Sequence, residues 1–211
     1  MAALGYEAAR PERPGVRSPV GQRDRSIHER RSVDLIAPMS LARGNLTSSR
    51  SVRAARVGAH GERAVSAAPG TQRSVLDRQW RTLRAFDAGP TGDAYVAGPA
   101  APLCAKAYKI HDRLDPSELR RNPDRLRAKD FADLYRVLLA VTPREAAAAF
   151  ARGLADPRIS QAVALGRDHL EQVLTDSFTV ASMVADAWGD PSRENEFRAR
   201  TDQWRRQFSS P

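Results

Sequence analysis

Cysteine, histidine and lysine are all scarce in this 211-residue chain, and their scarcity excludes several kinds of site. Cys104 is the only cysteine, which excludes an internal disulfide and a zinc site built from several cysteines. The four histidines are scattered along the sequence, with no pair at the spacing of metal ligands. No apolar run is long enough to span a bilayer, and the first residues lack the pattern of a secretory signal. We therefore expect a cytoplasmic protein.

Lysine is the rarer of the two basic residues by a wide margin, with three lysines against 31 arginines. Lys106, Lys109 and Lys129 all lie within one stretch of 24 residues. An ammonium is a compact point charge, whereas a guanidinium is a broad planar fork, so the two are not interchangeable. Either these lysines lie on solvated helix faces and cluster by chance, or they mark the functional region of the chain. We expect the second.

The net charge of +9 is unevenly distributed. Residues 1–100 contribute +7 and residues 101–211 contribute +2. A field of this sign favours polyanions such as RNA, DNA or nucleotide phosphates. Arginine-rich chains are also often basic without binding any polyanion, so charge alone leaves both interpretations open.

The first half of the sequence predicts irregular chain with short strands. Residues 1–31 are rich in arginine, proline and glycine and are expected to lack a stable fold. Residues 32–38, SVDLIAP, predict a buried strand, followed by a basic loop over residues 40–72 and further strands near residues 74–76, 80–86 and 95–97. Asp34 is the one charge in the first of these strands. It is either a surface residue or a ligand of a metal or cation.

From residue 98 the periodicity is helical, so the fold class is α+β with a C-terminal helical bundle. A first helix is expected over residues 98–114 and a second from about residue 124 to 141. Thr142, Pro143 and Glu145 form a capping box that opens a third helix. Asp-Pro pairs at residues 156–157 and 190–191 predict the starts of two later helices.

Charged residues of opposite sign recur on the first two of these helices. Lys106 and Arg113 lie two turns apart on one helix, and Asp130 and Asp133 share a face of the next. If the two helices pack together, these groups form either a ladder of solvated salt bridges or a phosphate-binding set of cations oriented by carboxylates. Spacing alone does not separate the two.

Two segments resemble paired motifs of the AbiEii-type nucleotidyltransferases, a branch of the polymerase-β-like nucleotidyltransferase superfamily. AKAYKIHDRL is similar to the first motif, with Lys106 and Arg113 at its lysine and arginine positions. KDFADLYRVL is similar to the second, which matches Lys129, Asp130 and Asp133. The resemblance covers roughly residues 30–140. It implies an incomplete nucleotidyltransferase-like α/β domain over residues 32–97, followed by a helical domain over 98–211.

The resemblance also implies a reaction and its participants. A nucleotide would pass from an NTP to an acceptor such as tRNA or another RNA, with Mg²⁺ bound in part by Asp34. Lys106 and Asp130 would be the catalytic residues, with Lys106, Arg113, Lys129 and Asp133 around the phosphates. A toxin of this kind would have a cognate antitoxin as its partner, and no membrane is implied.

One departure from the family pattern concerns its metal-binding motif. The superfamily carries a Gly-Ser turn followed by Asp-x-Asp on a strand, and this sequence contains no such combination. Two-metal phosphoryl transfer needs several carboxylates, so we expect a truncated, inactive chain that lacks the N-terminal catalytic segment. Three function classes follow: a nucleotidyltransferase by descent, a non-catalytic nucleotide- or RNA-binding module, and an interaction protein whose helices dock on a partner.

Overall fold

A computed structural model describes residues 6–8, 16–19, 33–34, 36–38, 53–55, 65–84 and 89–208. The contacts between residues divide the chain into two units, Met1–Thr71 and Gln72–Pro211. The second unit therefore begins before residue 98, where the sequence pattern places the start of the helical domain.

Among its described residues, the first unit has two small three-stranded sheets. One has the antiparallel order β1 (Tyr6–Ala8), β2 (Val16–Pro19), β3 (Val33–Asp34). In the other, β6 (Val65–Ala68) lies between β4 (Ile36–Pro38), which is parallel to it, and β5 (Arg53–Ala55), which is antiparallel.

These sheets correct the prediction of one buried strand over residues 32–38. β3 and β4 pair in different sheets, and the side chain of Ile36 is 56% exposed. The apolar run was too short to distinguish one buried strand from two edge segments. Strands β1 and β2 lie within residues 1–31, and β5 and β6 within the predicted basic loop. The rest of both segments, apart from residues 69–72, lies outside the described residues.

The second unit begins with a 3-10 helix and an antiparallel hairpin. The 3-10 helix η4 (Thr71–Val75) replaces the strand predicted near residues 74–76. The hairpin pairs β7 (Arg78–Arg84) with β8 (Thr91–Ala97), which confirms the strands predicted there. The helical turn directs the buried Arg73 toward the helical part of the unit, where its Nη2 donates to the carbonyl of Ala149 at 2.6 Å.

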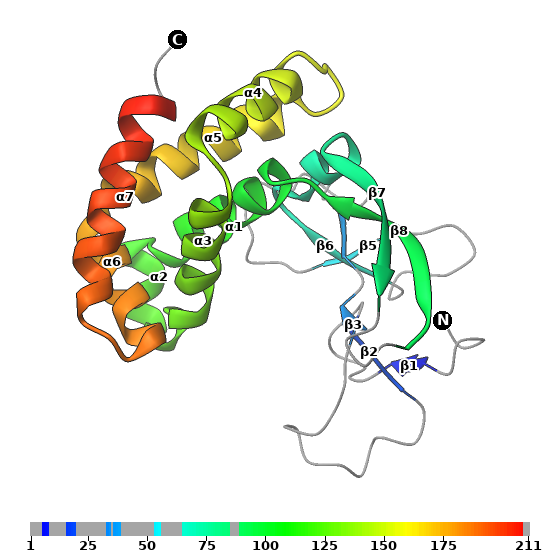
Figure 1. Ribbon diagram of the computed structural model, residues 1–211. Helices are drawn as coiled ribbons and strands as arrows, with labels where there is room; N and C mark the ends of the chain where they lie inside the picture. Colours follow the sequence, from blue (N-terminus) through cyan, green and yellow to red (C-terminus); the bar gives the residue numbers. More distant parts are fainter. Residues whose placement is uncertain are drawn as a thin grey trace. The chain divides into compact units, whose positions relative to one another are not determined.

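Seven α-helices follow the hairpin in the described part of the chain, so the protein is α+β and mostly helical (Figure 1). They are α1 (Ala100–Arg113), α2 (Pro116–Arg121), α3 (Ala128–Ala140), α4 (Pro143–Leu154), α5 (Ser160–Thr175), α6 (Ser177–Trp188) and α7 (Ser192–Phe208). A 3-10 turn, η5 (Pro123–Arg125), precedes α3. The sequence pattern missed α2, because its six residues are too few to show a periodicity, and it did not separate α6 from α5.

Side-chain caps explain where several helices start. The predicted capping box is present at α4: the Thr142 hydroxyl accepts from the Glu145 amide, and the Glu145 carboxylate accepts from the Thr142 amide. Asp115 caps α2 by accepting from the amides of Ser117 and Glu118. α6 ends at Gly189, which has a left-handed backbone with φ of 61°.

One apolar core is shared by six of these helices, α2 being the exception. α1 contacts α3 and α5, α3 contacts α6, and α6 contacts α7. One face of α7 is buried, and its four residues are spaced by four, three and four positions: Phe197, Thr201, Trp204 and Phe208. Among the described helices none has the length and apolar character that a membrane crossing needs.

We expect Gly166→Ala to destabilise the fold, because Gly166 of α5 lies directly against Cys104 and Tyr108 of α1. A Cβ at Gly166 would lie 2.3 Å from Cys104 Sγ and 3.2 Å from Tyr108 Cε2. Overpacking of this kind costs about 1–3 kcal/mol, which exceeds the gain in helix propensity of about 1 kcal/mol. Urea denaturation followed by circular dichroism measures the change. The double variant Cys104→Ala/Gly166→Ala should recover most of the loss, and a double variant no more stable than Gly166→Ala would contradict this contact.

Candidate functional site: an ion-pair cluster on helices α1 and α3

Helices α1 and α3 pack side by side and bring together the charged residues that the sequence singled out. Three cations of α1, namely Lys106, Lys109 and Arg113, face two carboxylates of α3, Asp130 and Asp133. On α1 the cations follow one another at spacings of three and four residues, so they share a face. We call these five residues the α1–α3 cluster.

Asp130 is the centre of the cluster. Its side chain is only 7% exposed and pairs with all three α1 cations. Its Oδ1 accepts from Lys109 Nζ at 2.6 Å and lies 3.5 Å from Lys106 Nζ. Its Oδ2 forms an ion pair with Nη1 of Arg113, without hydrogen-bond geometry at that nitrogen. A single buried carboxylate thus fixes the positions of three cations.

Asp133 lies at the more exposed side of the cluster. Its Oδ2 accepts from Lys106 Nζ at 2.7 Å, and its Oδ1 accepts from Nη1 of the exposed Arg136 at 3.0 Å. Lys129 is exposed at the start of α3 and makes no ion pair within 4.0 Å among the described residues. Its charge nevertheless contributes to lowering the pKa of Asp133.

The electrostatics of the cluster favour ionised carboxylates. Burial raises the pKa of Asp130, but the hydrogen bond from Lys109 and the charges of Lys109, Arg113 and Lys106 outweigh it, so the pKa is lowered. The pKa of Asp133 is lowered in the same way, with Lys106 as the main opposing partner. Burial and the neighbouring arginines lower the pKa of Arg113, against the charge of Asp130. At neutral pH both carboxylates are therefore ionised.

Lys109 is the member of the cluster that the family resemblance did not assign. It makes the shortest lysine contact to Asp130 and is 46% exposed, the most of the three cations. The signal was present in the sequence, because Lys109 lies between Lys106 and Arg113 at helical spacing.

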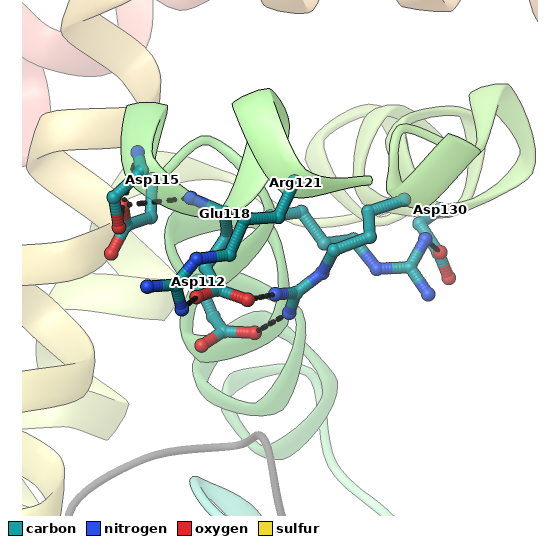
Figure 2. A network of polar contacts seen from close by, with 8 residues as sticks. Asp112, Asp115, Glu118, Arg121 and Asp130 are labelled. Carbon is teal, nitrogen blue, oxygen red and sulfur yellow. Dashed lines mark hydrogen bonds and ion pairs between the residues drawn. The ribbon is translucent and has the colours of Figure 1, made fainter. Parts of the chain in front are cut away.

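A second polar network fixes the segment between α1 and α3 (Figure 2). Arg125 of η5 donates to Asp112 of α1 and to Glu118 of α2, each at 2.5 Å. Arg121 also donates to Glu118, at 3.3 Å. Because Asp112 is adjacent to Arg113, this network holds the end of α1 close to the start of α3, where Asp130 lies.

Two cavities of the helical unit lie away from the α1–α3 cluster. One of about 540 Å³ is lined by Asp168, Glu171, Gln172, Thr175 and Asp176 of α5 and the turn after it. A second, of about 400 Å³, lies between the end of α1 and α5, and His111 is in its wall. His111 stacks on His169, with ring centroids 3.8 Å apart. Neither of these two cavities includes a member of the α1–α3 cluster.

Two other kinds of chemistry find no support in the described residues. Cys104 is buried, and burial raises the pKa of its thiol to about 12, so it remains protonated at neutral pH and is no nucleophile. No group of three or more His, Cys, Asp or Glu side chains within these residues is arranged to hold a metal ion. The predicted metal ligand Asp34 lies in β3, and its side chain is outside the described residues.

Comparisons with protein-family models, with curated proteins and with solved structures give no match to this chain. The resemblance to AbiEii-type nucleotidyltransferases therefore remains a prediction that depends on the quoted motifs alone. The predicted Mg²⁺, NTP, RNA and antitoxin partners depend on the same resemblance.

Proposed function

We propose that the helical unit binds the phosphate groups of nucleotides at the α1–α3 cluster, without transferring them. The observation that carries this proposal is the convergence of three α1 cations on one buried carboxylate. A salt-bridge ladder would pair each cation with its own carboxylate. Here the cations outnumber the carboxylates, and the excess charge is held in a fixed position.

The charge balance at this surface is positive. Lys106, Lys109 and Arg113 face Asp130 and Asp133, and the exposed cations Lys129 and Arg136 act on Asp133. Five cations against two carboxylates leave a surplus of three positive charges. A triphosphate carries a negative charge of similar size, and its oxygens accept hydrogen bonds from ammonium and guanidinium groups.

Free donors are available at the exposed side of the cluster. A lysine ammonium has three N–H donors, and Lys109 uses one of them on Asp130. Its side chain is nearly half exposed, so the other two can reach a phosphate without breaking that bond. Asp130 would then hold the ammonium in place before the ligand arrives, which reduces the entropy lost on binding.

Binding without transfer follows from the carboxylates that the sequence offers. If the resemblance holds, Asp34 would be a metal ligand, and Lys106 would contact the triphosphate with Asp130 behind it. Mg²⁺ would supply charge neutralisation and orient the attacking group. The sequence contains no Asp-x-Asp pair to complete such a site, whereas the cations are all present. This combination supports a nucleotide-binding module of nucleotidyltransferase-like type.

Calorimetric titration with ATP and with inorganic tripolyphosphate tests the proposal. Lys109→Ala and Lys106→Ala should each weaken binding by about 1–3 kcal/mol, the range for a charge-assisted hydrogen bond, with the α-helical signal unchanged. Arg205→Ala, at an exposed position on α7, is the matched loss of a cation and should change binding little. Titration with tRNA shows whether the phosphates of a polymer compete for the same cations.

Two outcomes would overturn the proposal. Equal effects of Lys109→Ala and Arg205→Ala would reduce the cluster to a ladder of salt bridges on a solvated surface. Incorporation of labelled NTP into RNA with Mg²⁺, abolished in Asp34→Ala, would show that the chain is an active transferase and that binding without transfer is wrong.

A further inference from the structure

The β7–β8 hairpin places aromatic and basic side chains on one of its faces. Residues directly opposite each other in an antiparallel pair share a face. Trp80 is opposite Tyr95, and Thr82 is opposite Asp93. By the same alternation, the face with these pairs also carries Arg78 and Arg84 at the two ends of β7. We call this the aromatic face of the hairpin.

The aromatic face is open to solvent. Trp80 and Tyr95 are each 59% exposed, and every residue of β7 is exposed. A two-stranded hairpin is at best marginally stable in water when no other element covers one of its faces. Exposed large aromatic side chains that lie together mark binding surfaces more often than isolated ones do. The exposure of both rings therefore indicates a ligand.

The contacts on this face define the chemistry of that ligand. Trp80 and Tyr95 meet edge to face, with ring centroids 4.8 Å apart. The guanidinium of Arg78 lies over the Tyr95 ring, 4.4 Å from its centroid. Asp93, the only acid on either strand, accepts a hydrogen bond from Thr82 at 2.6 Å. Rings for stacking and arginines for phosphates are the combination used by proteins that bind single-stranded nucleic acid.

The base of the hairpin is fixed to the helical unit through Asp77. The backbone carbonyl of Asp77 accepts from the Gly98 amide at 2.7 Å. The side-chain Oδ2 of Asp77 accepts from the Ala101 amide, in the first turn of α1, at 2.8 Å. These bonds join the start of β7 to the end of β8 and to α1. The aromatic face is thus presented on a hairpin whose ends are held, which limits the ordering needed when a ligand binds.

We infer that the aromatic face of the β7–β8 hairpin binds single-stranded nucleic acid, with bases stacked on Trp80 and Tyr95 and phosphates contacted by Arg78 and Arg84. The arginines match the charge of the backbone, and an aromatic ring stacks on any base, so the site has little sequence preference. This inference concerns other residues than the α1–α3 cluster and does not depend on nucleotide binding there.

Fluorescence anisotropy with the full chain and labelled oligo-dT and oligo-U of about 12 nucleotides tests the inference. Trp80→Ala should weaken binding about 5- to 150-fold, the loss expected for one stacked base. Phe178→Ala is the matched control, since Phe178 is also an exposed aromatic residue with an arginine, Arg198, over its ring. It should leave the affinity unchanged.

Two further variants separate stacking from a loss of hairpin structure. Trp80→Phe retains a ring at this position and should keep most of the affinity. Arg84→Gln should reduce the slope of log affinity against log salt by about 0.7, the value for one phosphate contact on a single strand. Both variants should show the wild-type helical circular dichroism.

Several outcomes would overturn the inference. Equal affinities of Trp80→Ala and Phe178→Ala would exclude stacking on this face. Binding of a duplex of the same length as tightly as the single strand would do so as well, because paired bases do not offer their faces. Absence of any binding to the oligonucleotides would also overturn the inference and would favour a protein partner for this face. ATP binding at the α1–α3 cluster is measured separately, with its own variants, so the two proposals can fail independently.

Discussion

Trp204→Ala is expected to cost about 3–5 kcal/mol of folding free energy, which is a large part of the stability of a domain of this size. Trp204 has no exposed surface and is the largest of the fully buried side chains in the described residues. Its ring contacts Phe208, with centroids 5.9 Å apart. Its Nε1 donates to the carbonyl of Leu138, near the end of α3, at 3.2 Å. The substitution would open a cavity and remove this bond.

Denaturation in urea, followed by circular dichroism at a helical wavelength, measures this loss. Trp80→Ala is the matched control, because it removes the same side chain from an exposed position and should change the helical transition by less than about 0.5 kcal/mol. Trp204→Phe keeps an aromatic ring in the core but loses the hydrogen bond. The lost bond should cost about 1 kcal/mol of folding free energy, in addition to the cost of the smaller side-chain volume. A loss for Trp204→Ala as small as that for Trp80→Ala would mean that α7 is not part of the core.

The α7 face was predictable from the sequence because it depends on local spacing alone. Phe197, Thr201, Trp204 and Phe208 follow the helical repeat, and any helix with this pattern buries that face. The partner of the face was not predictable. The carbonyl of Leu138 accepts from both Trp204 and Arg200, across more than sixty residues of sequence, and only the packing of α7 against α3 creates this contact.

Four of the five members of the α1–α3 cluster were predicted from the sequence, but its geometry was not. The spacing placed Lys106 and Arg113 on one helix and Asp130 and Asp133 on the next, and these residues do meet. The sequence could not show that Asp130 is buried and shared by three cations, since its burial is set by the approach of α1 and α3. The helical spacing on α1 did indicate Lys109, which joins the cluster, but nothing in the sequence showed that Lys129 would remain exposed.

The N-terminal half was the least predictable part. The segment SVDLIAP combines strand-forming residues with a charge, and short apolar runs do not specify which sheet a strand joins. The strand predicted at residues 74–76 lies instead in and just after a 3-10 helix, where the Arg73 carbonyl accepts from the amides of Leu76 and Asp77. The two strands after it were predicted, the first from its β-branched and aromatic residues, but their pairing in a hairpin and the exposure of their side chains were not.

Helix α1 connects the two proposed binding surfaces. Its first turn is bonded to Asp77 at the base of the hairpin, and its middle carries the cations that surround Asp130. Its opposite side is apolar and buried, with Leu103, Ala107 and Ile110 fully enclosed. Substitutions on the exposed side therefore change binding without emptying the core, whereas substitutions on the buried side test the fold.

Asp130→Asn is the second substitution expected to have a large effect, a loss of about 2–4 kcal/mol of folding free energy. Breaking a buried ion pair by removing one partner costs about 3–5 kcal/mol, because the remaining charges are left uncompensated. The lower range applies here, since Lys109 and Lys106 are partly exposed and water can solvate them. Arg113 is only 16% exposed, so among the three cations its charge is the least compensated by water once the Asp130 charge is removed. The asparagine keeps the shape of the side chain, so the effect reports charge.

The same variant should also change how stability depends on pH. The pKa of Asp130 is lowered in the folded protein, so its contribution is fully present above the ordinary carboxyl value of 3.8 and is lost as the pH falls through the native pKa. Wild type should lose stability in acid, and Asp130→Asn should lose less. Denaturation curves at a series of pH values, from neutral to acidic and at constant ionic strength, give the folding free energy as a function of pH. The slopes of this dependence are compared between wild type and Asp130→Asn.

Asp133→Asn provides the control for these measurements. Asp133 shares Lys106 with Asp130, but its side chain is more exposed and its second partner, Arg136, is at the surface. Exposed pairs contribute about 0–1 kcal/mol, so this variant should be clearly more stable than Asp130→Asn. Suppose that the two variants lost equal stability and that their folding free energies had equal slopes against pH. The three α1 cations would then be solvated independently of Asp130. The fixed positive surface that the nucleotide-binding proposal requires would then be absent.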